Sequence, residues 1–272
     1  MLKIGVLIPC YNVHHSIKKV LTSIPSNILQ RIDQIVTVDN NSQDDTLQIL
    51  ESIQNQSGEI GKKLVIIKNF QNYGLGGSQK IAYRYFLDHG FSHFFIVHGD
   101  GQGDSHEISK NFFKIFDQKP DIDLIIASRF MKGSHTKAYN PLRVFGNHVF
   151  NLITYVCSGH HMSDSGAAII FIRVEILKHV IFEDLTNSFQ FNPELNIFLY
   201  NLKNLKIVEI PLSWSDSKDK SNISSLNYCL TLLKILLRYR FNKTFLRRSA
   251  TKLFHEQSQR ITPSYQILTK SL

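Results

Sequence analysis

One loop of the sequence gathers side chains that could hold a metal ion. The apolar stretch 94–97 is followed by the run HGDGQGD, which contains His98, Asp100 and Gln102. Alternate residues leaving a strand point to the same side, so these three side chains are expected to face one point. Carboxylate and amide oxygens suit Mg²⁺ or Mn²⁺, and an imidazole shifts the preference towards Mn²⁺. A single carboxylate binds a bare ion weakly, so the pattern predicts a site that a ligand's phosphates complete. The alternative is a plain loop in which His98 caps a strand and Asp100 stabilises a turn.

The elements that must position this loop alternate in type along the first 130 residues. Short β-branched runs predict strands buried on both faces, at 3–8, 34–38, 63–68, 93–97 and 123–127. Helical patterns lie between them, at 14–24, 44–56, 77–89 and 105–117. A further helical segment, 141–158, precedes a strand expected at 167–172. Alternation of this kind predicts an α/β fold with a mostly parallel sheet and helices on both faces.

Each of the first five predicted strands leaves into a polar loop. The loops occupy residues 9–12, 39–46, 69–78, 98–104 and 128–130. Ligands collect at the carboxyl ends of parallel strands, so five polar exits at one edge predict a ligand site. The first turn lacks GxGxxG and the chain lacks GxxxxGK[ST]. Dinucleotide dehydrogenases and P-loop enzymes are therefore not expected. A nucleotidyltransferase would carry a glycine-rich, lysine-containing loop after the first strand, and IPCYNVHH contains none.

A set of motifs resembles one enzyme family. In order they are IPCYN (8–12), VDNNSQDDT (38–46), NYGLGGS (72–78), HGDGQGD (98–104), ASRF (127–130), SDSGAA (163–168), FNPEL (191–195) and EIPLSW (209–214). Together they are similar to family 2 glycosyltransferases of the GT-A fold, in the branch of polyprenyl-phosphate sugar synthases such as dolichyl-phosphate mannose synthase. The resemblance covers roughly residues 3–225. It implies a three-layer α/β/α GT-A domain over residues 1–225 and a C-terminal amphipathic helix.

The resemblance also implies an activity and its site. The implied reaction is inverting, metal-dependent transfer of a sugar from a UDP- or GDP-linked donor. Asp100 would be the second aspartate of the family's DxD motif and would hold Mn²⁺ or Mg²⁺ with Gln102 and His98, so Asp100 also counts as catalytic. Asp39 would accept hydrogen bonds from the base or ribose. The residues expected to bind the nucleotide sugar are Pro9, Tyr11, Asn12, Asp39, Asn69, Gly77 and Asp100.

Some positions have simpler explanations or depart from the family pattern. Asp39 could be the N-cap of the following helix, and Pro9 and Tyr11 could merely end a strand. His98 stands at the first position of DxD, and Asn40 stands where the family's second acid usually lies. Both substitutions remove negative charge from the nucleotide pocket. A nucleotide-sugar-binding protein that has lost catalysis is therefore an alternative.

The acceptor side of the expected site depends on two arginines and an acid. Arg129 and Arg143 match basic positions that would face phosphate, which a planar guanidinium can bind in bidentate fashion. Each could instead form a surface salt bridge. Asp164 is the candidate general base for a hydroxyl acceptor, with Glu194 second. A phosphate acceptor is already ionised and needs little such help. The expected acceptor is a polyprenyl phosphate or a glycan or lipid-linked acceptor, in synthesis of cell-surface polysaccharide or glycoconjugate.

One arginine of the family pattern is missing on this side. The family carries an arginine after the motif EIPLSW, and this chain does not. Lys218 or Lys220 could take its place.

The net charge of +9 is concentrated near the C-terminus. Residues 226–272 carry nine basic side chains and one acid, Glu256. Residues 226–248 are expected to form an amphipathic basic helix that lies in an anionic membrane interface, packs on the domain or contacts a homodimer partner. Residues 249–272 are expected to be a flexible basic tail. A nucleic-acid-binding module using this tail is the alternative from another class, although no nucleic acid is expected.

Cysteine content and hydropathy bear on where the chain works. No stretch approaches 18 uninterrupted apolar residues, and the three cysteines show no CxxC spacing. This pattern favours a reducing compartment. A cytoplasmic protein at the cytoplasmic face of the membrane is expected.

Overall fold

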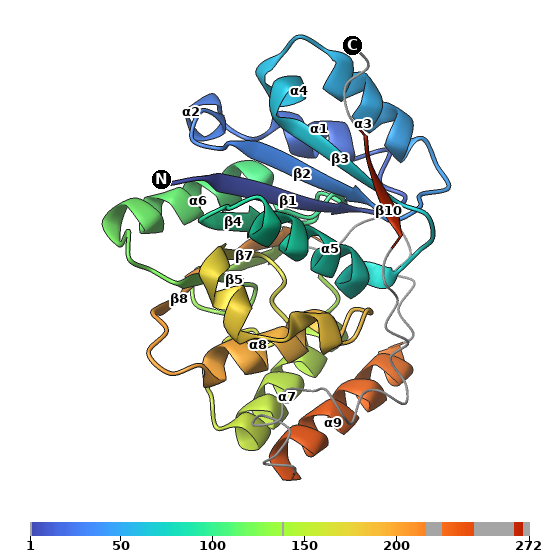
Figure 1. Ribbon diagram of the computed structural model, residues 1–272. Coiled ribbons are helices and arrows are strands. Elements are labelled where there is room, and N and C mark those ends of the chain that lie inside the picture. Colours follow the sequence, from blue (N-terminus) through green and yellow to red (C-terminus); the bar gives the residue numbers. More distant parts are fainter. Residues whose placement is uncertain (1, 138, 216–224, 242–263, 269–272) are drawn as a thin grey trace.

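The computed structural model describes residues 2–137, 139–215, 225–241 and 264–268. Among these residues the main sheet has eight strands in the order β10-β3-β2-β1-β4-β7-β5-β8 (Figure 1). Its strands are β1 (Ile4–Cys10), β2 (Gln34–Asp39), β3 (Leu64–Asn69), β4 (His93–Ile96), β5 (Leu124–Ser128), β7 (Ile170–Arg173), β8 (Ile207–Pro211) and β10 (Tyr265–Leu268). Only β7 and β10 run antiparallel to their neighbours. The expected mostly parallel sheet is confirmed.

The five predicted strands of the N-terminal half are all present and parallel, so their carboxyl ends share one edge. The sixth was expected at 167–172, but β7 begins at Ile170. The earlier residues form a turn closed by a 3.1 Å hydrogen bond from Ala167 N to the Asp164 carbonyl. That turn places Asp164 beside the end of β5, which β7 neighbours in the sheet.

Helices cover both faces of the sheet (Figure 1). They are α1 (Ile17–Thr22), α2 (Ser26–Leu29), α3 (Thr46–Asn55), α4 (Glu59–Lys63), α5 (Gly74–Asp88), α6 (Ser105–Gln118), α7 (Pro141–Ser158), α8 (Phe191–Asn201) and α9 (Ser225–Phe241). Two 3₁₀ turns, η1 (Val174–His179) and η2 (Phe182–Asp184), precede α8. The first core packs α1, α2, α3 and α6 on one face, and the second packs α5, η1 and α8 on the other.

Side-chain alternation along the strands produces the two cores. In β4, Phe95 belongs to the first core, while Phe94 and Ile96 belong to the second. All three side chains are fully buried. Successive strand residues point to opposite faces, so an uninterrupted apolar run requires a layer on each side. The expected three-layer α/β/α architecture follows.

A second, two-stranded sheet lies against the loop after β4. Strand β6 (His135–Lys137) pairs with β9 (Ser213–Ser215), and Trp214 forms a bridge with Gly103. Ser215 N also donates to the Gln102 carbonyl at 2.9 Å. These contacts join the loop at Gln102 and Gly103 to the small sheet.

The C-terminal elements differ in part from expectation. Helix α9 lies beside α7 with its apolar face buried, which agrees with packing on the domain (Figure 1). Residues 242–248 of the expected helix lie outside the described residues. Within the tail expected to be flexible, Tyr265–Leu268 instead form β10, so that prediction is wrong for these four residues. Strand β10 covers the otherwise open edge of β3. Within the described part of the chain, no helix has both the length and the apolar character to span a membrane.

Candidate active site at the carboxyl ends of the strands

The loop after β4 presents one aspartate to solvent and uses the other to start a helix. Asp100 is exposed, and its Oδ1 accepts a 3.0 Å hydrogen bond from Gln102 N. Gly101 adopts a left-handed φ of 69°, which completes this turn. Asp104 is the N-cap of α6, because its Oδ1 accepts from His106 N at 2.9 Å. Of the two aspartates, Asp100 is therefore the one placed to meet a ligand.

His98 is half-buried and contacts the small sheet through Trp214 of β9. Its ring meets Trp214 edge-on, with centroids 6.3 Å apart. Its Nε2 is buried and has no hydrogen-bond partner in the described structure. The pKa of His98 is lowered, mainly because the ring is buried. The charge of Asp100 acts to raise this pKa, and the charge of Arg129 acts to lower it. A neutral imidazole with an unpartnered nitrogen is suited to donate electrons to a cation.

The ends of β1 and β2 place Asp39 inside the site and Tyr11 at its rim. Asp39 is 1% exposed, and burial raises its pKa above the ordinary value. Its oxygens receive hydrogen bonds from Ser42, whose amide lies 3.4 Å from each of them, and α3 starts at Thr46. Asp39 is therefore not the N-cap of that helix. Tyr11 is 39% exposed.

Pro9 and Asn12 shape the same two strand ends. Pro9 lies within β1, where its carbonyl accepts a hydrogen bond from Gly99 N at 3.3 Å. This contact joins β1 to the loop that carries Asp100. Asn12 has a φ of 53° and accepts from Gln43 N at 2.8 Å, which joins the exits of β1 and β2.

A network of neutral amides lies beside Asp39. Asn40 Oδ1 accepts hydrogen bonds from Asn69 Nδ2 at 3.0 Å and Tyr73 N at 2.9 Å, while its Nδ2 donates to Asn72 Oδ1 at 2.8 Å. Asn69 is fully buried, and its own Oδ1 has no hydrogen-bond partner in the described structure. The amide at position 40 both donates and accepts, which a carboxylate could not do. The local hydrogen bonds therefore depend on asparagine at position 40, where the family usually has an acid.

Gly77 belongs to α5 and allows close packing at the start of that helix. A Cβ added at Gly77 would lie 2.6 Å from the Tyr73 Cβ, and the Gly77 amide donates to the Asn187 carbonyl at 3.0 Å. The glycine lets α5 begin at Gly74, three residues earlier than expected, with its first turn against the loop at 186–188. This contact positions the start of the helix next to Asn69 and Asn72.

Arg129 and Asp164 form a buried, bidentate ion pair. Arg129 Nε donates to Asp164 Oδ2 at 2.7 Å and Nη2 to Oδ1 at 2.9 Å, and the Arg129 amide adds a 3.1 Å bond to Oδ2. The two side chains are 16% and 1% exposed. Burial alone would lower the pKa of Arg129. The Asp164 carboxylate raises this pKa by more than burial lowers it, so the net shift is upward. The guanidinium lies over Phe130 at 4.9 Å and over Trp214 at 5.7 Å. Both oxygens of Asp164 are thus engaged.

Arg143 lies outside this pair, on the exposed first turn of α7. Its carbonyl accepts from Asn147 Nδ2 at 2.7 Å, and the same Nδ2 approaches the Tyr139 hydroxyl at 3.4 Å. Arg129 Nη1 donates to that hydroxyl at 3.5 Å. The two arginines predicted to face phosphate are therefore linked through Asn147 and Tyr139, with only Arg129 in the buried pair.

Glu194 lies at the start of α8 behind the loop that contacts α5. It is 1% exposed, Oε2 accepts from Thr186 N at 2.9 Å, and Oε1 is buried without a hydrogen-bond partner in the described structure. Burial raises the pKa of Glu194 to about 7. Lys80 approaches from α5 and donates to Asn187 Oδ1 at 2.6 Å, and burial lowers its pKa to about 8. These two groups hold the loop at 185–187 rather than the strand exits.

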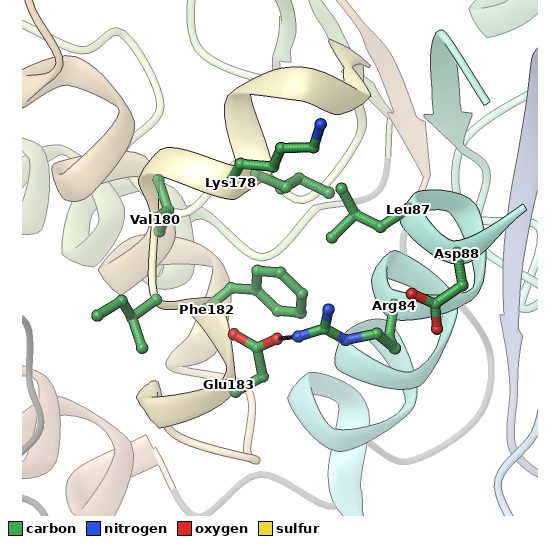
Figure 2. Close-up of a pocket in the computed structure, with 9 residues that line it drawn as sticks. Arg84, Leu87, Asp88, Lys178, Val180, Phe182 and Glu183 are labelled. Carbon is green, nitrogen blue, oxygen red and sulfur yellow. Dashed lines mark hydrogen bonds and ion pairs between the residues drawn. The ribbon is translucent and has the colours of Figure 1, made fainter. Parts of the chain in front are cut away.

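A separate hollow lies between α5 and residues 177–183 (Figure 2). Arg84 of α5 pairs with Glu183 across it, and Phe182 and Leu87 form part of its wall. None of the predicted site residues lines this hollow. The strand exits therefore remain the candidate site.

The residues at the exit of β4 fit a divalent cation that is coordinated partly by the protein and partly by the phosphate oxygens of a ligand. Asp100 provides one exposed carboxylate, and His98 provides an unpartnered imidazole nitrogen. The residues that the structure describes contain no group of three or more His, Cys, Asp or Glu side chains able to hold a metal ion by themselves. Such a donor set suits Mg²⁺ or Mn²⁺, which commonly keep part of their coordination for phosphate oxygens and water.

Trp214 and Tyr139 were not expected to belong to the site. Trp214 contacts the His98 ring and the Arg129 guanidinium, and Tyr139 contacts Arg129 from the segment before α7. Trp214 is the single tryptophan of the chain and is the last residue of the motif EIPLSW. That position was an available signal, because tryptophan faces often hold cationic side chains. Nothing local to Tyr139 distinguishes it.

The chain belongs to glycosyl transferase family 2. Residues 5–181 match this family, and the match includes the exits of all five N-terminal strands. A protein of *Methanococcus voltae* named UDP-N-acetylglucosamine–dolichyl-phosphate N-acetylglucosaminyltransferase is 24% identical over 217 residues. That alignment covers 77% of this chain and 84% of the relative. The chain is thus a family 2 glycosyltransferase, an enzyme class that the site's composition alone had only suggested.

Solved structures of two other enzymes share the fold. Mannosyl-3-phosphoglycerate synthase from *Rubrobacter xylanophilus* superposes with a TM-score of 0.61 at 14% identity, covering 100% of this chain and 88% of its own. Glucosyl-3-phosphoglycerate synthase from *Mycobacterium tuberculosis*, in complex with Mn²⁺, UDP and glucosyl-3-phosphoglycerate, superposes with a TM-score of 0.55 at 13% identity. That match covers 88% of this chain and 80% of the other. At such identities the likeness establishes the GT-A fold.

Proposed function

We propose that this protein transfers a sugar, with inversion, from a UDP-sugar to a lipid-linked phosphate acceptor in a reaction that requires a divalent cation. One observation carries the proposal: the adjacent strands β2, β1 and β4 end with a buried carboxylate, Asp39, and an exposed one, Asp100, at the same edge. The *Methanococcus voltae* relative has a UDP-sugar and dolichyl phosphate in its name, and the *Mycobacterium tuberculosis* neighbour holds UDP and Mn²⁺. Both support UDP over GDP as the donor's nucleotide.

The donor would lie across the exits of β1, β2 and β4. Asp39 would accept hydrogen bonds from the uracil or ribose, with Pro9 and Tyr11 beside it. Asp100 would hold the cation through its exposed carboxylate, with His98 and Gln102 as neutral partners. A divalent cation bound there supplies positive charge that neutralises the departing diphosphate. The protein's own contribution is to fix the diphosphate so that the acceptor can approach the anomeric carbon from the opposite side.

The buried ion pair favours a phosphate acceptor over a hydroxyl. A hydroxyl would need a general base, yet both oxygens of Asp164 accept hydrogen bonds from Arg129. A phosphate is already ionised and can attack without losing a proton. Arg129 would then present its Nη1 side, next to Tyr139, to the acceptor, while Asp164 keeps the guanidinium in place. Asp164 is accordingly proposed as a positioning residue.

The test compares two aspartates of the same loop, Asp100→Asn and Asp104→Asn. Thermal unfolding is followed with UDP, GDP, CMP, dTDP and ADP, each with and without Mn²⁺. Ligand at about 100 times its Kd stabilises the folded state by ~3 kcal/mol. For a domain of this size that corresponds to a rise in Tm of about 5–10 °C. Wild type and Asp104→Asn should show this rise with UDP and Mn²⁺, because asparagine also caps helices well. Asp100→Asn should not.

Two results of the thermal unfolding would count against the proposal, and one result of a turnover assay would as well. A metal-dependent UDP shift that survives Asp100→Asn would move the cation site elsewhere, and a shift with GDP alone would change the donor. Release of UDP from a UDP-sugar is then measured with and without a short-chain polyprenyl phosphate. Binding of UDP without acceptor-dependent release would instead support a protein that binds nucleotide sugars and does not catalyse transfer.

A further inference from the structure

Helix α7 exposes a continuous apolar stripe. Leu142, Phe145, Leu152 and Val156 are 75%, 66%, 62% and 66% exposed, and Val149 between them is 40% exposed. These positions follow the spacing i, i+3, i+7, i+10, i+14, which at 100° per residue confines them to an arc of about 80°. A run of large, open apolar side chains this long needs a partner in an ordinary soluble domain.

Helix α9 exposes a second stripe of the same kind. Leu230, Leu233, Leu237 and Phe241 are 48%, 38%, 43% and 80% exposed. The buried face of α9, which includes Leu232, Ile235, Leu236 and Tyr239, is occupied by packing on the domain. The exposed stripe is therefore additional to the face that holds the helix in place.

The charges on the two helices point to the kind of partner. The sequences of α7 and α9 contain no aspartate or glutamate, whereas they carry Arg143, Lys234, Arg238 and Arg240. Two copies of this chain meeting through these helices would bring cations against cations, which disfavours self-association. An anionic lipid surface accepts both features, because its headgroups attract the cations and its acyl boundary takes up the apolar side chains.

We propose that α7 and α9 form the surface by which this protein docks on an anionic phospholipid bilayer, with the exposed stripe of α7 inserted at the level of the headgroups. The two helices lie side by side at the opposite end of the molecule from α3 and α4 (Figure 1). They lie parallel to the surface in this arrangement and do not cross it. Docking depends on these side chains alone, so it stands or falls separately from the proposed sugar transfer.

The opposite side of α7 faces the candidate site. Asn151 Nδ2 donates to the Ser163 carbonyl at 2.7 Å, and its Oδ1 accepts from Ser165 N at 2.9 Å, on either side of Asp164. Asn147 approaches Tyr139, which contacts Arg129. One helix thus has the acceptor-side residues on its inner face and the proposed bilayer contact on its outer face. An acceptor embedded in the bilayer would reach the site along this helix.

The experiment measures sedimentation of the full chain with vesicles of phosphatidylcholine alone or mixed with phosphatidylglycerol. The test variant is Leu142→Gln/Phe145→Gln/Leu152→Gln, and the matched control is Leu2→Gln/Ile181→Gln, which changes exposed apolar side chains elsewhere. The wild type should bind the mixed vesicles, more weakly at high salt. The triple variant should lose about tenfold in affinity, equivalent to ~1.4 kcal/mol, and the control should bind like the wild type.

Three results would overturn the proposal. The wild type could fail to bind mixed vesicles, or the triple variant and the control could bind equally well. The third is a wild-type dimer in sedimentation velocity that the triple variant converts to monomer, which would assign the α7 stripe to a second copy of the chain. Circular dichroism of the triple variant should match the wild type, because all three substituted side chains are exposed. Asp100→Asn should bind vesicles normally even where it fails to bind UDP.

Discussion

Replacing Glu194 by glutamine should change how stability depends on pH. Glu194 is 1% exposed, and burial raises its pKa from the ordinary 4.5 to about 7. Between these two pH values the folded protein keeps the proton on Glu194, while the unfolded chain releases it. The folded state then binds more protons, so the free energy of unfolding falls as pH rises through this window. Glutamine is neutral throughout and can still accept the hydrogen bond from Thr186 N.

The size of the effect follows from the two pKa values. A difference of about 2.5 units corresponds to ~3 kcal/mol of stability lost between pH 4.5 and 7. Near pH 5 the variant should be close to the wild type, and near pH 7.5 it should be more stable by up to that amount. Lys80, whose pKa is lowered to about 8, contributes a change of opposite sign only above pH 8. The window below pH 7.5 therefore isolates Glu194.

The assay is urea unfolding followed by tryptophan fluorescence at half-unit steps between pH 4.5 and 7.5. The difference between wild type and Glu194→Gln removes contributions from other carboxyl groups, such as Asp39. Glu175→Gln is the control, since Glu175 is exposed and pairs with Lys178 on the surface. Parallel curves for wild type and Glu194→Gln across the whole window would refute the assigned protonation of Glu194. A variant less stable than the wild type at pH 7.5 would show that Glu194 is instead ionised and paired with Lys80.

Two further substitutions test the hydrogen bonding of the site. Asn40→Asp would set a carboxylate oxygen against Asn72 Oδ1, now 2.8 Å from the Asn40 amide nitrogen, and should cost ~2 kcal/mol in urea unfolding. The neighbouring change Asn41→Asp should cost little, and equal costs would argue against the amide network. Asp164→Asn should lose ~3 kcal/mol of stability, because it leaves the Arg129 guanidinium buried beside a neutral partner. If stability were unchanged while kcat fell, Asp164 would be acting as a general base after all.

The sheet was predictable because its signal is local. Each N-terminal strand is a short apolar run with a polar exit, and parallel strands with crossover helices bring those exits to one edge. Strand β10 was not predictable in this way. Its four residues, Tyr265–Leu268, pair with a strand some 200 positions earlier, and the Ser264 amide donates to the Tyr73 hydroxyl at 3.0 Å. Pairing over such a separation leaves no trace in local composition.

The positions of several candidate site residues were predictable from the sequence, but their hydrogen bonds and ion pairs were not. Asp39, Asp100 and Arg129 were named from motif positions, and the structure places all three at the carboxyl edge of the sheet. The pairing of Arg129 with Asp164 joins residues 35 positions apart and depends on the turn that delays β7. Arg129 was expected to bind phosphate and Asp164 to act as a base, but the two side chains form an ion pair with each other. Such pairing depends on tertiary contacts that motif order does not encode.

Helix α7 shows why a surface can escape sequence analysis and still bear on mechanism. Its sequence is apolar on most sides, so the helical pattern alone does not say which residues pack inward. The structure settles this with Asn147 and Asn151, whose amides are used against the segments that carry Tyr139 and Asp164. The large apolar residues are left on the outer side. A helix that needed only to support the buried ion pair would have a polar outer face. The apolar outer face would suit a helix that also brings the Arg129 site to a lipid-borne phosphate, so the proposed docking surface and the proposed acceptor agree with each other although each is tested separately.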